Sequence, residues 1–370
     1  MERQPSQRFS PETGKASRRA RARQFSLRAL LAALVLCAAC SGCTGKPNVP
    51  KSRVPRIGFA MDTLKEERWY IDRTDFLAEA EKKGAQVTVE VADDNGDEQL
   101  AQVRHLVAQG IDVLVLIPHD ATAAARCVSV ARQAGVKVIS YDRLVRNAGC
   151  DLYISFDNVQ VGRLQAQAIL TAVPKGNYVI AEGPVSDYNV TMIRQGLEEE
   201  LKAPVQSGRV KILKDFNTDD WMADVAADEV ENILVNGQKI DAVIAENDGL
   251  AGGVITTLSK FGLIPSVPVT GMDADLAACQ RVMEGQQLMT VYKPIGKLAS
   301  TAADFAVEYA QGQKPKIPGK IFDGKYSVPY YSIEPVAVNR QNMAQTVLRD
   351  GFHQVSQVYM NLPQSEWPAQ

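Results

Sequence analysis

The sequence predicts an α/β protein with two doubly wound parallel sheets, one in each of two domains. Two observations support this fold class. Short apolar runs rich in Val, Ile and Leu alternate with amphipathic helical patterns from residue 54 onward, as parallel strands and their crossover helices do. The 370 residues are also enough for two domains of ordinary size.

The first series of alternating segments predicts the N-terminal domain. Strands are expected at 56–60, 86–92, 112–118 and 137–142, with helices at 68–83, 98–110 and 122–135. These helices end at Gly84, Gly110 and Gly135. Gly is the residue that most easily adopts the left-handed conformation that closes a helix.

A second series follows the apolar segment 151–158 and predicts the C-terminal domain. Strands are expected at 177–183, 210–216, 241–247, 267–273 and 288–292, with helices at 190–202, 221–235, 251–262 and 274–285. A helix at 295–311 and the β-rich run 326–338 then cross back over both domains. We therefore expect an N-terminal domain of 54–157 plus 294–322, a C-terminal domain of 158–293 plus 323–360, and a multi-strand hinge near 158, 293 and 323.

Residues 1–43 have the pattern of an export signal. Eight Arg and Lys residues within 1–28 lead into the apolar run LRALLAALVLCAACSGC at 27–43, which is too short to span a bilayer comfortably. Ser41-Gly42-Cys43 resembles a bacterial lipobox, so we expect Cys43 to be lipidated and to become the mature N-terminus. Cys40 is a rival site, and a plainly cleaved signal or an uncleaved anchor are the alternatives. Residues 44–53 would then form a polar tether.

Composition and motifs exclude several classes of protein. The net charge of −2 gives no reason to expect a nucleic-acid partner. Outside the signal only Cys127, Cys150 and Cys279 remain, without metal-ligand spacing, and Cys127 and Cys279 lie in helical apolar patterns typical of buried thiols. The three His are scattered, so neither a zinc site nor a His-based triad is supported. We expect no metal, no cofactor and no catalysis.

Polar and aromatic residues follow the ends of the predicted strands. In open α/β sheets ligands bind beyond the carboxyl ends of the strands. The candidate ligand-binding residues there are Arg68, Trp69, Asp142, Arg143, Asp187, Asn189, Trp221, Asn247, Asp273 and Lys293. Carboxylates accept hydrogen bonds from hydroxyls, Arg and Lys donate to them, Asn does both, and an indole can cover an apolar ring face. This inventory indicates a neutral polyol, with Trp69 and Trp221 as two walls of the site, one from each domain.

Structural roles are alternatives for some of these residues. Asp273 and Asp248 could cap the helices that follow them. Arg68 could lie on a solvated helix face, and Trp221 could belong to the hydrophobic core of its helix. An enzyme that uses Asp142 and Asp273 as an acid–base pair is a further alternative.

The chain resembles the family of periplasmic D-xylose-binding proteins of bacterial ABC transporters over about 54–355. The stretches that carry the resemblance include LKEERW (64–69), YISFDN (153–158), KIDAVIAENDGLAGG (239–253), GMDADLA (271–277) and MTVYKPI (289–295). The resemblance implies the fold of type I periplasmic binding proteins and a site for a monosaccharide, most simply D-xylose. It also implies a monomer that delivers the sugar to an ABC permease. A sensor that presents its ligand to a receptor is the alternative role.

The family's sugar contacts carry over to all ten candidate residues. The chain departs from the family around Asp187 and lacks an aromatic that the family can carry four residues before Trp221, which leaves room for a related pentose or hexose. The lipobox in place of a plain signal implies a membrane-tethered protein of the periplasm or cell envelope.

Overall fold

The computed structural model describes residues 53–368. From Val54 onward the chain forms one compact unit. The expected signal peptide, the lipidated Cys43 with its rival Cys40, and the tether up to residue 52 lie outside the described residues. Within the described part, no helix has the length and apolar character needed to cross a membrane.

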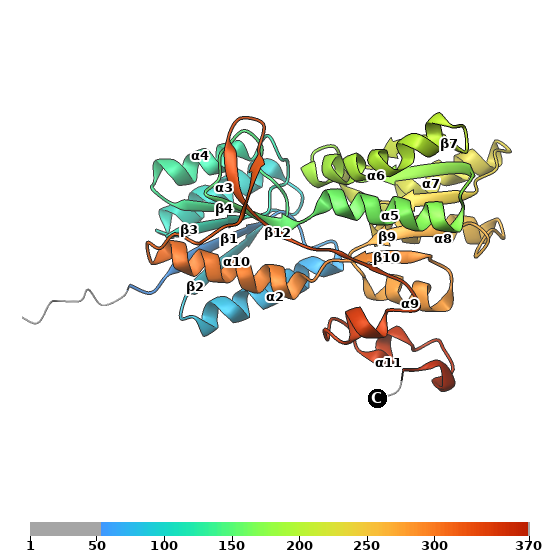
Figure 1. Cartoon of the computed structure of the whole chain (residues 1–370). Coiled ribbons are helices and arrows are strands. Elements are labelled where there is room, and N and C mark those ends of the chain that lie inside the picture. The colour runs from blue at the N-terminus through green and yellow to red at the C-terminus, as the bar shows by residue number, and fades with distance from the viewer. Residues whose placement is uncertain (1–52, 369–370) are drawn as a thin grey trace, which may run out of the picture. The chain divides into compact units, whose positions relative to one another are not determined.

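A seven-stranded sheet forms the core of the N-terminal domain (Figure 1). Its strand order is β11-β12-β5-β4-β3-β1-β2. Neighbouring strands are parallel except the β11–β12 pair. The strands are β1 (Arg56–Met61), β2 (Gln86–Val91), β3 (Val113–Leu116), β4 (Lys137–Tyr141), β5 (Leu152–Phe156), β11 (Gly319–Phe322) and β12 (Ser327–Ile333).

A six-stranded sheet forms the C-terminal domain, in the order β13-β10-β9-β8-β6-β7. Only the pair formed by β13 and β10 is antiparallel in this sheet. The strands are β6 (Gly176–Glu182), β7 (Val210–Asn217), β8 (Ala242–Ala245), β9 (Val269–Met272), β10 (Met289–Tyr292) and β13 (Val336–Val338). The two-domain, parallel-sheet class predicted from the sequence is confirmed.

Helices cover both faces of each sheet. In the N-terminal domain, α2 (Glu67–Lys82) and α10 (Ile295–Ala310) pack against one face, and α3 (Gly96–Ala108) and α4 (Ala125–Gln133) against the other. In the C-terminal domain, α7 (Ala223–Val235) and α8 (Asp248–Lys260) cover one face, and α5 (Asn158–Ala172) and α6 (Tyr188–Gln206) the other. Successive side chains of β1 point to opposite faces of the sheet. Phe59 packs in the core under α2 and α10, and Ala60 packs in the core under α3 and α4.

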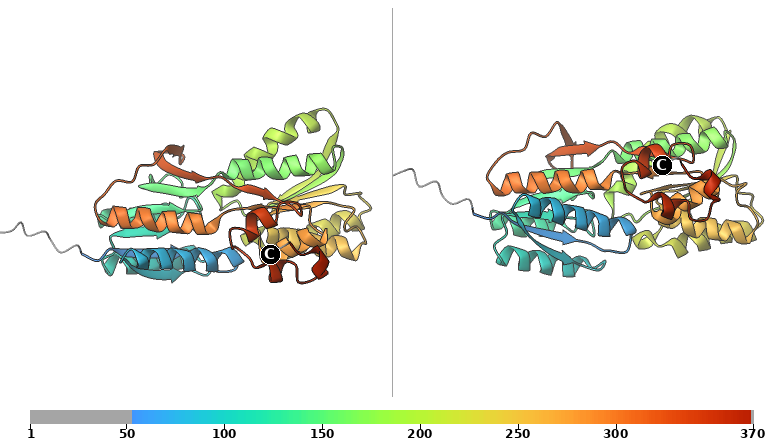
Figure 2. Two further views of the ribbon diagram at one scale, coloured as in Figure 1. Left: turned by 60° about the horizontal axis from the view of Figure 1, so that its bottom comes forward. Right: turned by 90° about the horizontal axis from the view of Figure 1, so that it is seen from below.

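The C-terminal segment packs on helix α9 (Leu276–Glu284), as two views in Figure 2 show. It contains the short elements η2 (Ala344–Leu348), α11 (Val355–Val358) and η3 (Gln364–Glu366). Val347 and Val358 are buried there in the same cluster as Val282 of α9. This segment therefore belongs to the C-terminal domain.

Three crossings join the domains, and one differs from the prediction. The chain passes from β5 into α5 at residue 158 and from β10 into α10 at 293–294, close to the expected hinge positions. The third crossing lies at 334–335, between β12 and β13, and not near 323. Strand β12 belongs to the N-terminal sheet because it pairs with β5, so the expected assignment of all of 323–360 to the C-terminal domain is corrected.

Local features account for further agreements and differences. Gly84, Gly110 and Gly135 have φ angles of 75°, 78° and 76°, so the predicted helix ends are confirmed. Among the described residues the free cysteines are Cys127, Cys150 and Cys279, and all are buried.

Helix α5 and strand β11 were not predicted. Helix α7 begins at 223 and not at 221, because a separate turn, η1 (Asp219–Trp221), precedes it.

Candidate functional site

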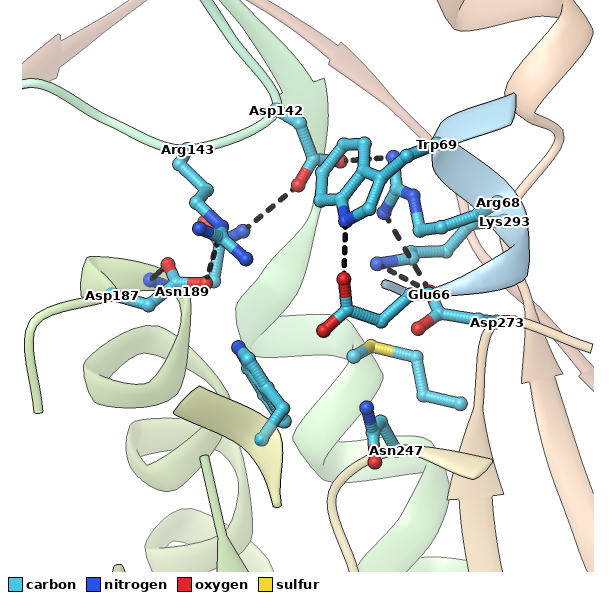
Figure 3. A pocket seen from close by; sticks show the side chains of 12 residues that line it. Glu66, Arg68, Trp69, Asp142, Arg143, Asp187, Asn189, Asn247, Asp273 and Lys293 are labelled. Atoms are coloured by element: carbon cyan, nitrogen blue, oxygen red, sulfur yellow. Dashed lines mark hydrogen bonds and ion pairs between the residues drawn. The ribbon is translucent and has the colours of Figure 1, made fainter. Parts of the chain in front are cut away.

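All ten candidate residues line one cavity, together with Glu66 and Met272. The cavity contains about 310 Å³ of empty space and lies where the carboxyl ends of strands from both sheets meet (Figure 3). Side chains from both domains therefore line one shared space.

Arg68 lies in the first turn of α2 and joins three carboxylates. Its Nη2 donates to Asp142 Oδ2 at 2.7 Å, its Nε donates to Asp72 Oδ2 at 3.1 Å, and its Nη1 lies 3.6 Å from Asp273 Oδ1. Burial alone would lower the pKa of the guanidinium, but the charges of Asp142 and Asp72 outweigh it and hold the pKa above its ordinary value. With only 3% of its surface exposed, Arg68 is not the solvated helix residue of the alternative interpretation.

Asp142 directly follows β4 and has a left-handed backbone conformation, with φ of 60°. Its carbonyl oxygen accepts hydrogen bonds from Tyr153 Oη at 2.9 Å and Ser155 Oγ at 2.6 Å, which stabilise this turn. Its carboxylate accepts from Asn189 Nδ2 at 3.2 Å. Burial raises the pKa of the Asp142 carboxyl, and the charges of Arg68 and Lys293 outweigh that effect, so the pKa lies below its ordinary value and Asp142 stays ionised.

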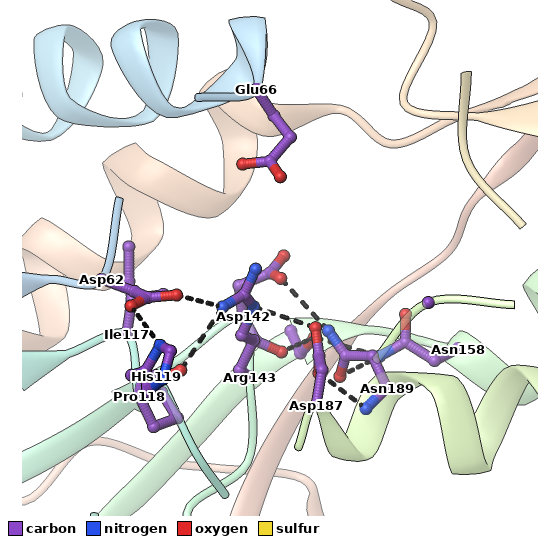
Figure 4. A network of polar contacts seen from close by, with 12 residues as sticks. Asp62, Glu66, Ile117, Pro118, His119, Asp142, Arg143, Asn158, Asp187 and Asn189 are labelled. Carbon is purple, nitrogen blue, oxygen red and sulfur yellow. Dashed lines mark hydrogen bonds and ion pairs between the residues drawn. The ribbon is translucent and has the colours of Figure 1, made fainter. Parts of the chain in front are cut away.

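Arg143 connects the two domains (Figure 4). Its Nη1 donates to Asp62 Oδ2 at 2.7 Å in the N-terminal domain, and its Nε lies 2.9 Å from Asp187 Oδ2 in the C-terminal domain. Asp62 also lies 2.9 Å from His119 Nδ1. The hydrogen bond to Asp62 raises the pKa of His119, whereas burial raises the pKa of Asp187. Arg143 is thus held between a carboxylate of each domain.

The two indoles lie on opposite domains. Trp69 is 3% exposed, and its Nε1 donates to Glu66 Oε2 at 2.5 Å. The guanidinium carbons of Arg68 and Arg143 lie 4.2 Å and 5.4 Å from its ring centroid, within cation–π distance. The Trp69 ring is therefore fixed by a hydrogen bond at its edge and by cations at its face.

Trp221 is the last residue of the short 3₁₀ turn η1, with φ of 58°, and does not belong to helix α7. The predicted helix start at 221 is wrong for this reason. An added Cβ at Gly183 would lie 2.3 Å from the indole, so the ring packs directly on the glycine backbone. Trp221 also touches the cores on both faces of the sheet, which means that it has a partial core role while it lines the cavity.

The remaining polar residues come from three neighbouring strand ends. Asn247 caps α8 through a hydrogen bond from Leu250 N to its Oδ1 at 2.8 Å. Lys293 Nζ lies 2.8 Å from Asp273 Oδ1. The N-cap of α9 is Asp275, so Asp273 does not cap that helix. Asp248 accepts from Gln287 and Thr290 side chains and does not supply the cap of α8 either.

Sequence reasoning missed two wall residues and the layer behind the wall. Glu66 and Met272 line the cavity, and Asp62 and Asp72 hold its two arginines. The i, i+4 spacing of Arg68 and Asp72 on one helix face is a signal that could have identified this pair. Nothing comparable in the sequence marks Glu66, whose direction depends on the Trp69 indole.

The wall combines charged, amide and aromatic side chains. Three cations, four carboxylates, two Asn side chains and two indoles converge on the cavity. Within the described residues no group of three or more His, Cys, Asp or Glu side chains could hold a metal ion. Such a wall offers many directed donors and acceptors and two flat apolar surfaces.

Comparison with known proteins agrees with this geometry. A family model described as a periplasmic binding protein domain matches residues 57–314. The D-xylose-binding periplasmic proteins of Escherichia coli (strain K12) and Haemophilus influenzae are 44% and 42% identical to the chain, and each match covers 82% of this chain and 92% of the relative.

A solved structure shares the whole fold. The carbohydrate transporter solute binding protein from Chloroflexus aurantiacus, in complex with D-glucose, superposes with a TM-score of 0.77 at 30% identity. The match covers 82% of this chain and 98% of that chain. The fold, the cavity and these similarities together show that the chain belongs to the periplasmic binding protein family.

Proposed function

We propose that the chain binds a monosaccharide, D-xylose in the first instance, in the cavity between its domains and delivers it to the permease of an ABC importer. One observation carries the proposal. Ten residues from seven strand ends, all suited to bind hydroxyls or a sugar ring, converge on one small buried cavity. The relatives that are 44% and 42% identical are named for D-xylose binding.

The wall offers hydrogen bonds that a neutral sugar can complete. Each sugar hydroxyl can donate to a carboxylate such as Asp142 or Asp273 and accept from Arg68, Arg143 or Lys293. Hydrogen bonds to charged groups contribute about 1.5–3 kcal/mol each. A micromolar dissociation constant needs about 8 kcal/mol of binding free energy, so a few such bonds and two indole faces suffice after the entropic cost of association.

The positions of the binding groups explain why a ligand would favour closure of the two domains. The Arg143–Asp187 and Asp142–Asn189 contacts join the N-terminal to the C-terminal domain. A sugar that bonds to both sides adds contacts only when the domains are closed, so it shifts the population toward that state. The chain carries out no chemistry in this scheme, and the closed, loaded form is what the permease receives.

The remaining parts of the proposal concern the location of the protein. Cys43 carries a lipid and tethers a monomeric binder to the cell envelope through residues 44–53. The support is the short apolar run before Ser41-Gly42-Cys43. Mass spectrometry of the mature N-terminus tests it, and an unmodified N-terminus downstream of Cys43, or lipid on Cys40, would contradict it.

A ligand screen tests the binding function. Ligand binding to the native state raises the melting temperature, so D-xylose and other pentoses and hexoses are compared by thermal shift, and the best ligands by isothermal titration calorimetry. We expect micromolar or tighter binding of D-xylose at one site per chain. No shift with any sugar would refute the proposal.

A further inference from the structure

Glu66 is a wall residue with an unusual environment. It is the N-cap residue of α2 and is partly buried, and its side chain makes no cap hydrogen bond. Figure 3 shows its carboxylate at the Nε1 edge of the Trp69 indole, which donates to it at 2.5 Å. Burial raises its pKa. A carboxylate has about four acceptor positions, so one indole N–H leaves most of its acceptor capacity available to a ligand.

Each cation that lines the cavity has a carboxylate partner, whereas Glu66 is a lining carboxylate without a cation partner. Lys293 is paired with Asp273, Arg68 with Asp142, and Arg143 with Asp187. Among the residues that the structure describes, no cation lies within ion-pair distance of Glu66. Arg143 attracts it and Asp273 repels it from farther away. Glu66 therefore leaves a negative charge on the cavity wall without a partner.

Glu66 lies where three cavities adjoin. Besides the inner cavity it lines a second one with Lys65, Asp220 and Met222, and a third one with His119 and Ser186. Trp221, from the opposite domain, borders all three spaces as well. A group on the ligand that points out of the inner cavity therefore meets Glu66.

We propose that Glu66 contacts the bound sugar as an acceptor and makes the site select neutral or cationic sugars over sugar acids. The inference rests on the proposed sugar-binding function and adds its charge selectivity. A hydroxyl or an ammonium group can donate to Glu66. A carboxylate cannot donate, and it meets a wall whose cations are already paired. Glu66 thus acts on the charge of the ligand, while the ten other residues bind the ring.

The test compares Glu66→Gln with the wild-type protein by calorimetry. Gln keeps the shape and an acceptor for the Trp69 indole but removes the charge. Because charge-assisted hydrogen bonds are roughly twice as strong as neutral ones, we expect D-xylose to bind about three- to tenfold more weakly. Glu81→Gln, at an exposed position of the same helix, is the matched control and should bind as the wild type does. Melting temperatures of the apo proteins check that both variants are folded.

Displacement of D-xylose by two hexoses tests the charge selectivity. D-glucuronate carries a carboxylate where D-glucose carries a hydroxymethyl group of similar size. With the wild-type protein, we expect glucuronate to displace D-xylose on the order of tenfold more weakly than glucose does. With Glu66→Gln, this difference between the apparent affinities for glucuronate and glucose should be severalfold smaller.

Three results would overturn the inference while leaving the proposed function intact. The first is an unchanged D-xylose affinity in Glu66→Gln. The second is that glucuronate displaces D-xylose from the wild-type protein as well as glucose does. The third is that Glu66→Gln leaves the ratio of the glucuronate and glucose affinities unaltered. If neither hexose competes, the D-xylose affinity of the variant decides alone. A wild-type protein that binds no sugar would instead refute the proposed function, and this inference with it.

Discussion

The two walls of the cavity are held in position by different means. On the N-terminal side, buried ion pairs orient the functional groups, with Arg68 held by Asp72 at 3.1 Å and Arg143 by Asp62 at 2.7 Å. On the C-terminal side, helix caps orient them, since Asp187 accepts from Asn189 N at 2.9 Å and Asn247 from Leu250 N at 2.8 Å. The first wall is thus a side-chain network, and the second is built into secondary structure.

This difference separates binding from folding. An ion-pair network can lose one member while each backbone segment keeps its conformation. A cap residue also satisfies the first amides of its helix, so its loss affects the stability of the domain as well. We therefore expect substitutions on the N-terminal wall to affect mainly affinity, and substitutions on the C-terminal wall to affect affinity and stability together.

The largest effect is expected for Asp142→Ala. The substitution removes a charged acceptor from the sugar hydroxyls and one of the three carboxylates around Arg68. Affinity should fall by about 2–4 kcal/mol, roughly 30- to 1000-fold. The apo melting temperature should change little, because Arg68 keeps Asp72. Calorimetry on folded protein measures the affinity, and a value within about threefold of wild type would remove Asp142 from the site.

Asp187→Ala should weaken binding and lower stability at the same time. It removes one of the two carboxylate partners of Arg143 and the cap of α6, and loss of a cap costs about 0.5–2 kcal/mol. Chemical denaturation of the apo protein should show this loss, in contrast to Asp142→Ala. Equal stability of the two variants would contradict the distinction between the walls.

Asp72→Asn should change how stability depends on pH. Burial raises the pKa of Asp72 from 3.8 to about 6. Because the folded-state pKa is the higher one, the contribution of this group to stability is fully present below about pH 4 and is lost as the pH rises through about 6. Relative to the wild type, Asp72→Asn should gain stability between these pH values, as urea denaturation at several pH values will measure. Parallel profiles for the two proteins would show that Asp72 is not the titrating group.

The smallest effect is expected for Glu67→Gln, which weakens a contact between the domains. Leu276 N of α9 donates to Glu67 Oε2 at 3.0 Å across the domains, and a charge at a helix N-terminus contributes about 0.3–1 kcal/mol. All sugars should therefore bind about two- to fivefold more weakly, by one common factor. A change in the relative affinities of the sugars would mean that Glu67 contacts the ligand directly.

The sequence predicted the strands and the strand-end residues because both depend on local patterns. The sequence-based prediction failed for elements whose conformation depends on tertiary contacts. Helix α5 was missed because its packing face holds Gly162, whose added Cβ would lie 2.0 Å from Ile193 O, and Gln165, which donates to three backbone carbonyls. Such a face lacks the apolar periodicity of a helix.

The missed features of the site have similar causes. Asp220 and Trp221 both have positive φ angles, 44° and 58°, which nothing in DDW indicates. The third crossing was misplaced because 326–338 is one β-rich run that two different sheets share. The strand-end pattern and the family resemblance both pointed to the ten candidate residues, but neither singled out Glu66.

The order of the strands also has a consequence for the folding of the protein. Strand β12, which lies between β5 and β11 in the first sheet, and the edge strand β13 of the second sheet both come from the last part of the chain, at 327–338. A chain that emerges from its N-terminus therefore lacks a strand of each sheet until almost all of it has been exported, so the N-terminal domain cannot finish folding first, as domains often do. Both domains should acquire their protease resistance together, after residue 338 has crossed the membrane.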